Sequence, residues 1–163
     1  MKEERQGQVY RPPASLNAGE TIAVAESCTG GMIAARLTEA PGASAYFAGG
    51  AVTYTDAVKT RVLGVPAAML RMYGAVSEPV ARAMAEGVLR VYQATWAMAT
   101  TGFAGPGGGN AAEPVGTVYI ATGRAGEIAV RRYVFAGNRE DVRRQAVEAA
   151  WIQLERHWTV KEE

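Results

Sequence analysis

The segment TIAVAESCTGG, residues 21–31, decides the fold of this chain, because an apolar strand pattern runs directly into a turn and a helix pattern. Residues 21–25 form a short apolar, partly β-branched run, which predicts a buried strand. Residues 29–40 predict a helix that begins at a hydroxyl residue and ends at Pro41-Gly42. Ser27 therefore falls in the strand-to-helix turn. Backbone N–H groups are unpaired there, and a serine could act as a nucleophile beside amides that hold an oxyanion.

Strand and helix patterns alternate through the rest of the chain. Strands are predicted at residues 46–54, 95–100, 115–122 and 128–135, and helices at residues 55–63, 67–72, 77–92 and 138–158, the last capped by Asn138. This mixture without an internal repeat predicts one α/β domain over residues 21–158, a three-layer α/β/α sandwich with a mixed sheet. Residues 1–20 are expected to form an irregular leader, and residues 159–163 a polar tail.

Composition narrows the classes of function. The 163 residues carry 17 basic and 16 acidic side chains, so bulk charge gives no reason to expect nucleic-acid binding. One cysteine, Cys28, excludes an internal disulfide and a multi-cysteine metal site. Neither a membrane span nor a signal-peptide core is evident, so we expect a cytoplasmic protein without a membrane partner. A homo-oligomer is compatible with a small, apolar-rich chain.

Lysine usage points to a second chemical group. The chain has only three lysines, and Lys2 and Lys161 lie in its tails, so Lys59 is the one lysine in its body. A desolvated lysine can lose its proton and serve as a general base, whereas an arginine cannot. An exposed helix lysine is the alternative interpretation, and the presence of Ser27 is what favours the catalytic one.

Six blocks in order resemble the CinA C-terminal domain family: AESCTGG (25–31), VTYTDAVKTRVLGV (52–65), YGAVSEPVARAMAEG (73–87), TTGFAGPGGG (100–109), PVGTVYIA (114–121) and NREDVRRQAVEAA (138–150). Active members of that family are nicotinamide-nucleotide amidohydrolases, also called NMN deamidases. The resemblance spans about residues 21–154. It implies a standalone α/β/α domain and a serine–lysine amidohydrolase that needs no metal or other cofactor.

The resemblance also implies roles for single residues. Ser27 matches the nucleophile, Lys59 and Tyr54 match the Tyr-x-x-x-x-Lys block, and Thr101 opens the glycine-rich block. Neutral Lys59 would take the Ser27 proton while the hydroxyl attacks the carboxamide of nicotinamide mononucleotide. Either Lys59 or Tyr54 would protonate the departing ammonia, and Tyr54 and Thr101 could instead only orient the pair. Further oxyanion and substrate contacts are expected from Thr29, Gly30 and Gly31, the last two through backbone N–H groups.

The glycine-rich segment TGFAGPGGG, residues 101–109, matches neither a P-loop nor a dinucleotide fingerprint. Two interpretations stand side by side, a ribose-phosphate contact through close backbone approach and a flexible surface turn. The same choice between a phosphate contact and solvent exposure applies to the arginines of two helices. The residues in question are Gly102, Gly105, Gly107 and Gly108 in the loop, and Arg61, Arg139, Arg143 and Arg144 on the helices.

Other residues offer weaker possibilities. A Cys28 nucleophile with His157 as its base is disfavoured, because His157 lies near the C-terminal end outside every block. Glu26 could orient Lys59 or serve a structural role. Two features depart from the family pattern, the leader without an amphipathic helix and Glu113 in place of a basic residue before Pro-Val-Gly. The pyrophosphatase activity associated with the larger family's N-terminal domain does not transfer to this chain.

Two functional hypotheses follow. The first is an amidohydrolase that converts nicotinamide mononucleotide to nicotinic acid mononucleotide and ammonia through a serine–lysine acyl-enzyme. The second is a non-catalytic nucleotide-sensing or partner-binding domain on the same scaffold. They differ in whether Ser27 Oγ and Lys59 Nζ come within hydrogen-bond reach of each other.

Overall fold

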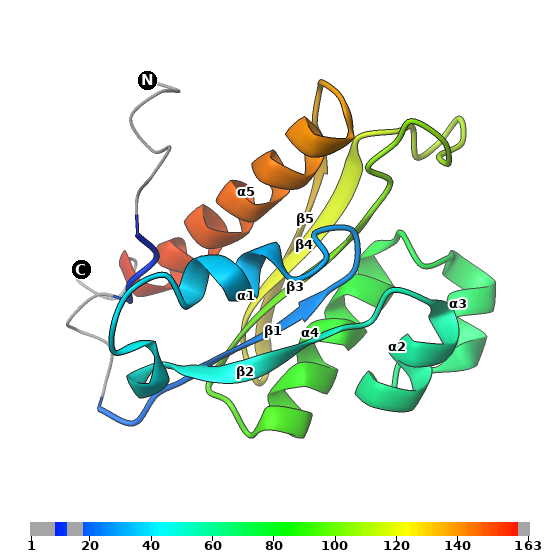
Figure 1. Cartoon of the computed structure of the whole chain (residues 1–163). Coiled ribbons are helices and arrows are strands. Elements are labelled where there is room, and N and C mark those ends of the chain that lie inside the picture. The colour runs from blue at the N-terminus through cyan, green and yellow to red at the C-terminus, as the bar shows by residue number, and fades with distance from the viewer. Residues whose placement is uncertain (1–8, 13–17, 160–163) are drawn as a thin grey trace.

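A five-stranded mixed sheet forms the middle layer of the molecule (Figure 1). The computed structural model describes residues 9–12 and 18–159. The strands are β1 (Ile22–Glu26), β2 (Phe47–Val52), β3 (Trp96–Gly102), β4 (Thr117–Arg124) and β5 (Glu127–Val134), in the spatial order β2-β1-β3-β4-β5. β1 pairs in parallel with β2 and β3, whereas β3–β4 and β4–β5 are antiparallel. The predicted mixed sheet is confirmed, and β4 and β5 form a hairpin.

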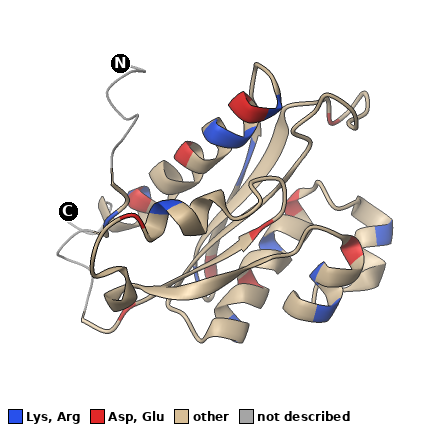
Figure 2. Cartoon of the chain, in the orientation of Figure 1, with Lys and Arg blue, Asp and Glu red and all other residues tan. Residues whose placement is uncertain are grey.

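Helices cover both faces of this sheet, which completes the predicted three layers. The helices are α1 (Met32–Leu37), α2 (Asp56–Leu63), α3 (Ala67–Tyr73), α4 (Glu78–Tyr92) and α5 (Arg139–Thr159), with a short 3₁₀ turn η1 (Ala43–Ala45). α1 and α5 lie over one face, and α2, α3 and α4 lie over the other (Figure 1). Basic and acidic side chains are interspersed along α5 (Figure 2).

The two faces of the central strands carry side chains of different size. Ile22 and Val24 of β1 point into the core under α1 and α5, while Ala23 and Ala25 point toward α4. Successive strand residues face opposite sides of a sheet, so this alternation of large and small side chains follows directly from the sequence. The alanine face lets α4 lie close to the sheet. On the same side of the sheet, α4 also lies close to α2. A Cβ on Gly87 of α4 would come 2.3 Å from the Leu63 carbonyl oxygen at the end of α2.

The helix after β1 is shorter than the predicted 29–40 segment. Gly30 and Gly31 have positive φ values of 60° and 98°, and the helix begins only at Met32. It ends at Leu37, and the Thr38 hydroxyl donates to the Ala34 and Ala35 carbonyls at that end. Residues 27–31 therefore form a separate turn, and it is this turn that carries Ser27.

Part of the predicted irregular leader belongs to the core. Residues 9–12 have no regular secondary structure, yet Tyr10 is buried and stacks on Trp151 of α5 with ring centroids 4.6 Å apart. The Arg36 guanidinium lies 4.7 Å from the centroid of the same ring. Residues 1–8 and 13–17 of that leader, and residues 160–163 of the predicted tail, lie outside the described residues.

Within the described residues, no helix is both long and apolar enough to cross a membrane. The same part of the chain contains no group of three or more His, Cys, Asp or Glu side chains placed to hold a metal ion.

Candidate active site

Ser27 and Lys59 meet at the carboxyl-terminal edge of the parallel strands. Ser27 follows β1, and Lys59 lies on the buried face of α2, the helix that follows β2. The Lys59 Nζ lies 3.3 Å from the Ser27 Oγ. Ser27 is 8% exposed and Lys59 only 1%. The contact expected from the sequence is therefore present, and the lysine is not the exposed helix residue of the alternative interpretation.

Two backbone carbonyls complete the surroundings of the Lys59 amine. Its Nζ donates to the Thr53 carbonyl at 2.9 Å and to the Tyr54 carbonyl at 3.3 Å. Burial lowers the pKa of Lys59 because it disfavours the charged form, against an opposing attraction from Asp56. A neutral amine has two N–H bonds and one lone pair. When the carbonyls accept the two N–H groups, the lone pair remains for the Ser27 hydroxyl proton.

Glu26 organises the turn from the inside of the molecule. Its fully buried carboxylate accepts hydrogen bonds from the Thr29 hydroxyl and from the backbone N–H groups of Gly31, Ile33 and Ala34. The Thr29 hydroxyl also lies 2.8 Å from that of Thr100 on β3. These four donors compensate the buried charge. Glu26 therefore has the structural role that the sequence left open, and Thr29 contacts Glu26 and Thr100.

The oxyanion donors nominated from the sequence are already hydrogen-bonded. The Gly31 N–H donates to Glu26 at 2.9 Å, and the Gly30 N–H donates to the Ser27 carbonyl at 3.0 Å. The Cys28 N–H, next to the nucleophile, donates to no carbonyl oxygen in the turns and loops of the described residues. The residue after a nucleophilic serine commonly supplies such a donor. Cys28 is a better candidate than either glycine for this reason.

Tyr54 contributes its carbonyl to the site, while its side chain points elsewhere. The ring is 56% exposed, and its hydroxyl accepts from Arg139 Nη2 at 3.0 Å. Arg139 Nη1 donates to the Gly105 carbonyl at 2.9 Å. Arg139 therefore joins the loop after β2 to the glycine-rich loop. The sequence had left a phosphate contact and solvent exposure open for this residue and did not predict the link.

Thr101 is buried at the end of β3, and its hydroxyl donates to the Ala75 carbonyl at 2.8 Å. This bond ties β3 to the segment between α3 and α4. The only side chain that hydrogen-bonds to the Lys59 amine among the described residues is that of Ser27. Thr101 thus fits the orienting role better than a direct one in proton transfer.

The glycines at the end of β3 and in the loop that follows it have different surroundings. A Cβ on Gly102 would come 2.6 Å from the Thr117 carbonyl oxygen, and one on Gly105 would come 2.6 Å from Val115. These two glycines are needed for packing against the segment leading into β4. Gly107 and Gly108 are exposed, and nothing lies within 4 Å of a Cβ at Gly107. Only this outer pair fits the interpretation as an open turn available to a ligand.

Glu113 is bound by two residues of the sheet. Its carboxylate accepts from the Tyr119 hydroxyl at 2.5 Å and from Arg132 Nε at 2.9 Å. Both partners lie on β4 and β5, and Arg132 also donates to the Ala112 carbonyl. Glu113, which stands where the family has a basic residue, therefore anchors the last part of the glycine-rich loop to β4 and β5.

Cys28 and His157 do not form a catalytic pair. Burial raises the pKa of the Cys28 thiol to about 12, so the thiol stays protonated near neutral pH. His157 lies in the last turn of α5, with its Nε2 3.1 Å from the Thr122 hydroxyl and its ring against Trp96. Cys28 is a small buried residue, as the sequence favoured, whereas His157 contacts Thr122 and Trp96 and is not the solvated helix-end residue that its position suggested.

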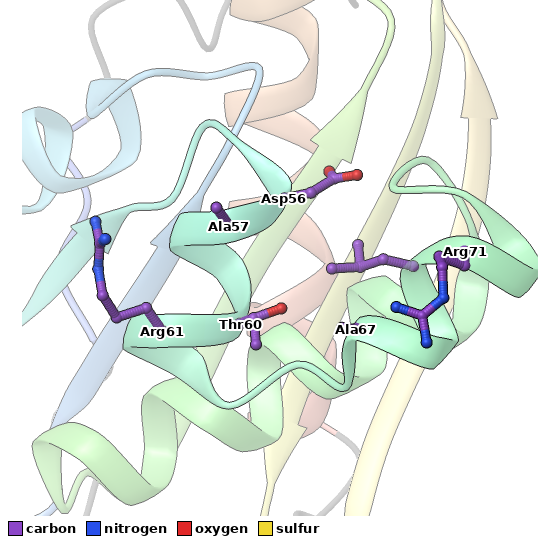
Figure 3. A pocket seen from close by; sticks show the side chains of 7 residues that line it. Asp56, Ala57, Thr60, Arg61, Ala67 and Arg71 are labelled. Carbon is purple, nitrogen blue, oxygen red and sulfur yellow. The ribbon is translucent and has the colours of Figure 1, made fainter.

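Arg61 lies away from the serine–lysine pair. It lines a groove of about 450 Å³ between α2 and α3, shown in Figure 3. Its lining residues are Asp56, Ala57, Thr60, Arg61, Ala67, Leu70 and Arg71. Lys59 points from the opposite, buried face of α2. The expectation that Arg61 and Ser27 share a substrate site receives no support from this arrangement.

Two arginines of α5 reach the site, at positions where helical spacing places residues on one face. Arg139 has been described above. Arg143 donates from Nε to the Cys28 carbonyl at 3.0 Å and from Nη2 to the Thr29 carbonyl at 3.3 Å. Arg144, one residue further, faces solvent and pairs with Asp141. The four-residue interval between Arg139 and Arg143 was the available signal, but it did not identify their partners.

Together these features define an α/β/α domain with a buried serine–lysine pair at the carboxyl edge of parallel strands. The chain belongs to the CinA family: the model of the CinA C-terminal domain matches residues 13–158.

Curated relatives and solved structures agree with this assignment. A CinA-like protein of Mycobacterium sp. (strain JLS) is 55% identical over 144 residues, which cover 88% of this chain and 34% of that protein. One of Anaeromyxobacter sp. (strain K) is 56% identical over 129 residues, covering 78% and 31%. The chain thus spans about a third of these relatives.

The solved structures match over most of their own length. A CinA superfamily protein from Klebsiella pneumoniae 700603 superposes with a TM-score of 0.80 at 40% identity, over 83% of this chain and 84% of that one. A competence/damage inducible protein from Agrobacterium tumefaciens gives 0.80 at 43% identity, over 83% of each chain.

Proposed function

We propose that this chain is an amidohydrolase that converts nicotinamide mononucleotide to nicotinic acid mononucleotide and ammonia. The observation that carries the proposal is the Lys59 amine, which is buried, lies 3.3 Å from Ser27 Oγ and has two carbonyl acceptors for its N–H groups. This arrangement supports a neutral lysine that accepts a proton from the serine. The resemblance supplies the substrate.

The first half of the reaction forms an acyl-enzyme. Lys59 takes the Ser27 proton while Oγ bonds to the carboxamide carbon, and the negative charge moves to the carbonyl oxygen. The Cys28 N–H stabilises that oxyanion. The Lys59 ammonium then gives its proton to the amide nitrogen as the C–N bond breaks, so ammonia leaves and an ester to Ser27 remains.

The second half returns the enzyme to its starting state. Water replaces ammonia, Lys59 removes a proton from it, and the hydroxide attacks the ester carbon. When the C–Oγ bond breaks, the Lys59 proton returns to Ser27, and nicotinic acid mononucleotide is released. Lys59 is favoured over Tyr54 as the acid toward ammonia, because the Tyr54 hydroxyl contacts Arg139 and the Lys59 amine contacts Ser27.

The experiment is ammonia release from nicotinamide mononucleotide by the wild type, Ser27→Ala and Ser77→Ala. Ser77 is a matched control, since it is also a buried serine but bonds to the Gly74 carbonyl at the start of α4. We expect activity that Ser27→Ala abolishes and Ser77→Ala retains. A folded wild type that binds the nucleotide without releasing ammonia would replace this proposal with the non-catalytic sensing domain.

A further inference from the structure

The side chain of Arg143 crosses from α5 to the turn that carries Ser27, more than a hundred residues earlier in the chain. It donates to the Cys28 carbonyl at 3.0 Å and to the Thr29 carbonyl at 3.3 Å, over separations of 115 and 114 residues. The two bonds leave from different guanidinium nitrogens. Arg143 therefore holds two successive peptide groups at once, which the planar fork of an arginine allows and a lysine ammonium does not reproduce.

Glu26 holds the same turn through other groups. Its carboxylate takes the Thr29 hydroxyl and the Gly31 N–H, and it continues to the first N–H groups of α1. The Arg143 cation thus binds carbonyl oxygens of the turn, while the Glu26 anion binds its N–H and O–H donors. The two anchors hold different peptide groups of the turn, since Arg143 binds those that follow Cys28 and Thr29, and Glu26 binds the one that precedes Gly31.

Gly30 makes room for this arrangement. Its φ is +60°, and a Cβ there would lie 3.1 Å from Arg143 Nη2. A side chain at position 30 would press on the guanidinium as well as strain the backbone. The glycine that the sequence nominated as an oxyanion donor therefore has a different local reason to be a glycine.

We propose that Arg143 is a positioning residue, which holds the turn after β1 so that Ser27 Oγ stays on the Lys59 amine. The amine is fixed independently, by the Thr53 and Tyr54 carbonyls. The 3.3 Å contact thus depends on two anchors on different parts of the chain, and Arg143 is the anchor on the serine side. This inference rests on the proposed function only where it predicts a change in turnover. The expected changes in hydrogen exchange and in Ser27 reactivity do not depend on it.

The test compares Arg143→Lys with Arg144→Lys in the full chain. Arg144 is adjacent on α5, is exposed and pairs with Asp141, so its variant controls for the loss of a guanidinium. Four readouts are used: thermal stability, hydrogen exchange of a peptide spanning residues 26–34, the rate at which phenylmethylsulfonyl fluoride modifies Ser27, and steady-state deamidation. Steady-state deamidation supplies kcat and KM.

In Arg143→Lys we expect faster exchange in the turn and a fall of about 100-fold in both kcat and the sulfonylation rate, because displacement of a reacting group by about 1 Å has that effect. KM should change little, since Arg143 bonds to the protein's own carbonyls. Arg144→Lys should match the wild type in every readout. Adding a small guanidinium salt to Arg143→Ala should restore part of the lost rate.

Unchanged exchange in Arg143→Lys, or unchanged Ser27 reactivity despite faster exchange, would overturn the inference. A wild-type Ser27 that reacts with neither phenylmethylsulfonyl fluoride nor nicotinamide mononucleotide would also overturn it. A wild type that is sulfonylated in an Arg143-dependent way but releases no ammonia would refute the proposed function and leave the positioning role standing. Normal deamidation in Arg143→Lys would refute the positioning role and leave the proposed function standing.

Discussion

Replacing Lys59 with methionine separates the chemistry of the amine from the packing of its stem. Methionine retains an unbranched apolar chain but has no N–H donor and no useful lone pair. The substitution removes the two hydrogen bonds to the Thr53 and Tyr54 carbonyls. At about 1 kcal/mol each, their loss would lower the free energy of unfolding by about 2 kcal/mol. Relief from burying an amine offsets part of this, so the variant should remain folded.

The effect on turnover should be much larger than the effect on stability. A general base contributes about 10²–10⁴-fold to the rate, and Lys59 serves in both halves of the proposed reaction. We therefore expect kcat for ammonia release to fall by about 1,000-fold or more in Lys59→Met. Arg61→Met is the matched control, because Arg61 lies on the outer face of the same helix and lines the groove of Figure 3. It should retain wild-type turnover.

A pH titration gives an independent check on the same residue. Burial lowers the pKa of Lys59, so the neutral, active form appears at lower pH than for an ordinary lysine, and kcat/KM should rise with pH through that pKa. Between this pKa and the ordinary value of 10.5, the unfolded chain binds more protons than the folded one. Wild-type stability should therefore rise with pH there, and Lys59→Met should lack this rise.

Either of two results would refute the reasoning. Lys59→Met could retain more than about a tenth of wild-type kcat. A loss of less than about 10-fold is smaller than the smallest loss expected when a general base is removed. Alternatively, its kcat/KM could show the same pH profile as the wild type, which would assign the titrating group to another residue.

Three further changes test the framework of the site. Glu26→Gln should lower the free energy of unfolding by about 3 kcal/mol in a urea titration, because its NH₂ group would face donors that now share a buried carboxylate; a loss below about 1 kcal/mol would contradict this role. Tyr54→Phe should keep kcat within about 10-fold of wild type, because Lys59 uses the residue's carbonyl; a loss of 1,000-fold would return the hydroxyl to the proton transfer. Gly87→Ala should lower the free energy of unfolding by about 2 kcal/mol or more despite the better helix propensity of alanine, since a Cβ would lie 2.3 Å from the Leu63 carbonyl oxygen. The control, Gly107→Ala, should be nearly neutral, and a Gly87→Ala variant more stable than the wild type would disprove that contact.

The strands and the layer arrangement were predictable because they depend on local patterns. The alternation of Ile22 and Val24 with Ala23 and Ala25 already distinguishes the two faces of β1. The start of α2 was likewise predictable, since Thr55 caps it through a bond from the Val58 N–H, and Asn138 does the same for α5. In each case the determining contact lies within a few residues.

The features that sequence alone did not predict come from contacts that do not follow a local pattern. The predicted first helix was too long because Glu26 and two glycines hold residues 27–31 in a separate turn. The partners of Arg139 and Arg143 depend on the start of α5 lying beside the turn after β1 and the glycine-rich loop, which requires the complete topology. The same holds for Arg61, since helical spacing does not reveal that its face of α2 is turned toward α3.

The parallel arrangement of β1 between β2 and β3 has a consequence for how the chain acquires its site. Residues 21 and 95 at the base of β1 and β3 are 74 apart in sequence, and Ser27 and Lys59 are 32 apart. Helices form from near neighbours, but strands so distant must first close long loops, which slows their pairing. During refolding from denaturant, helical circular dichroism should therefore recover ahead of Ser27 reactivity. The serine thus reports the last stage of folding, because only a chain with its central strands in register brings it to the lysine.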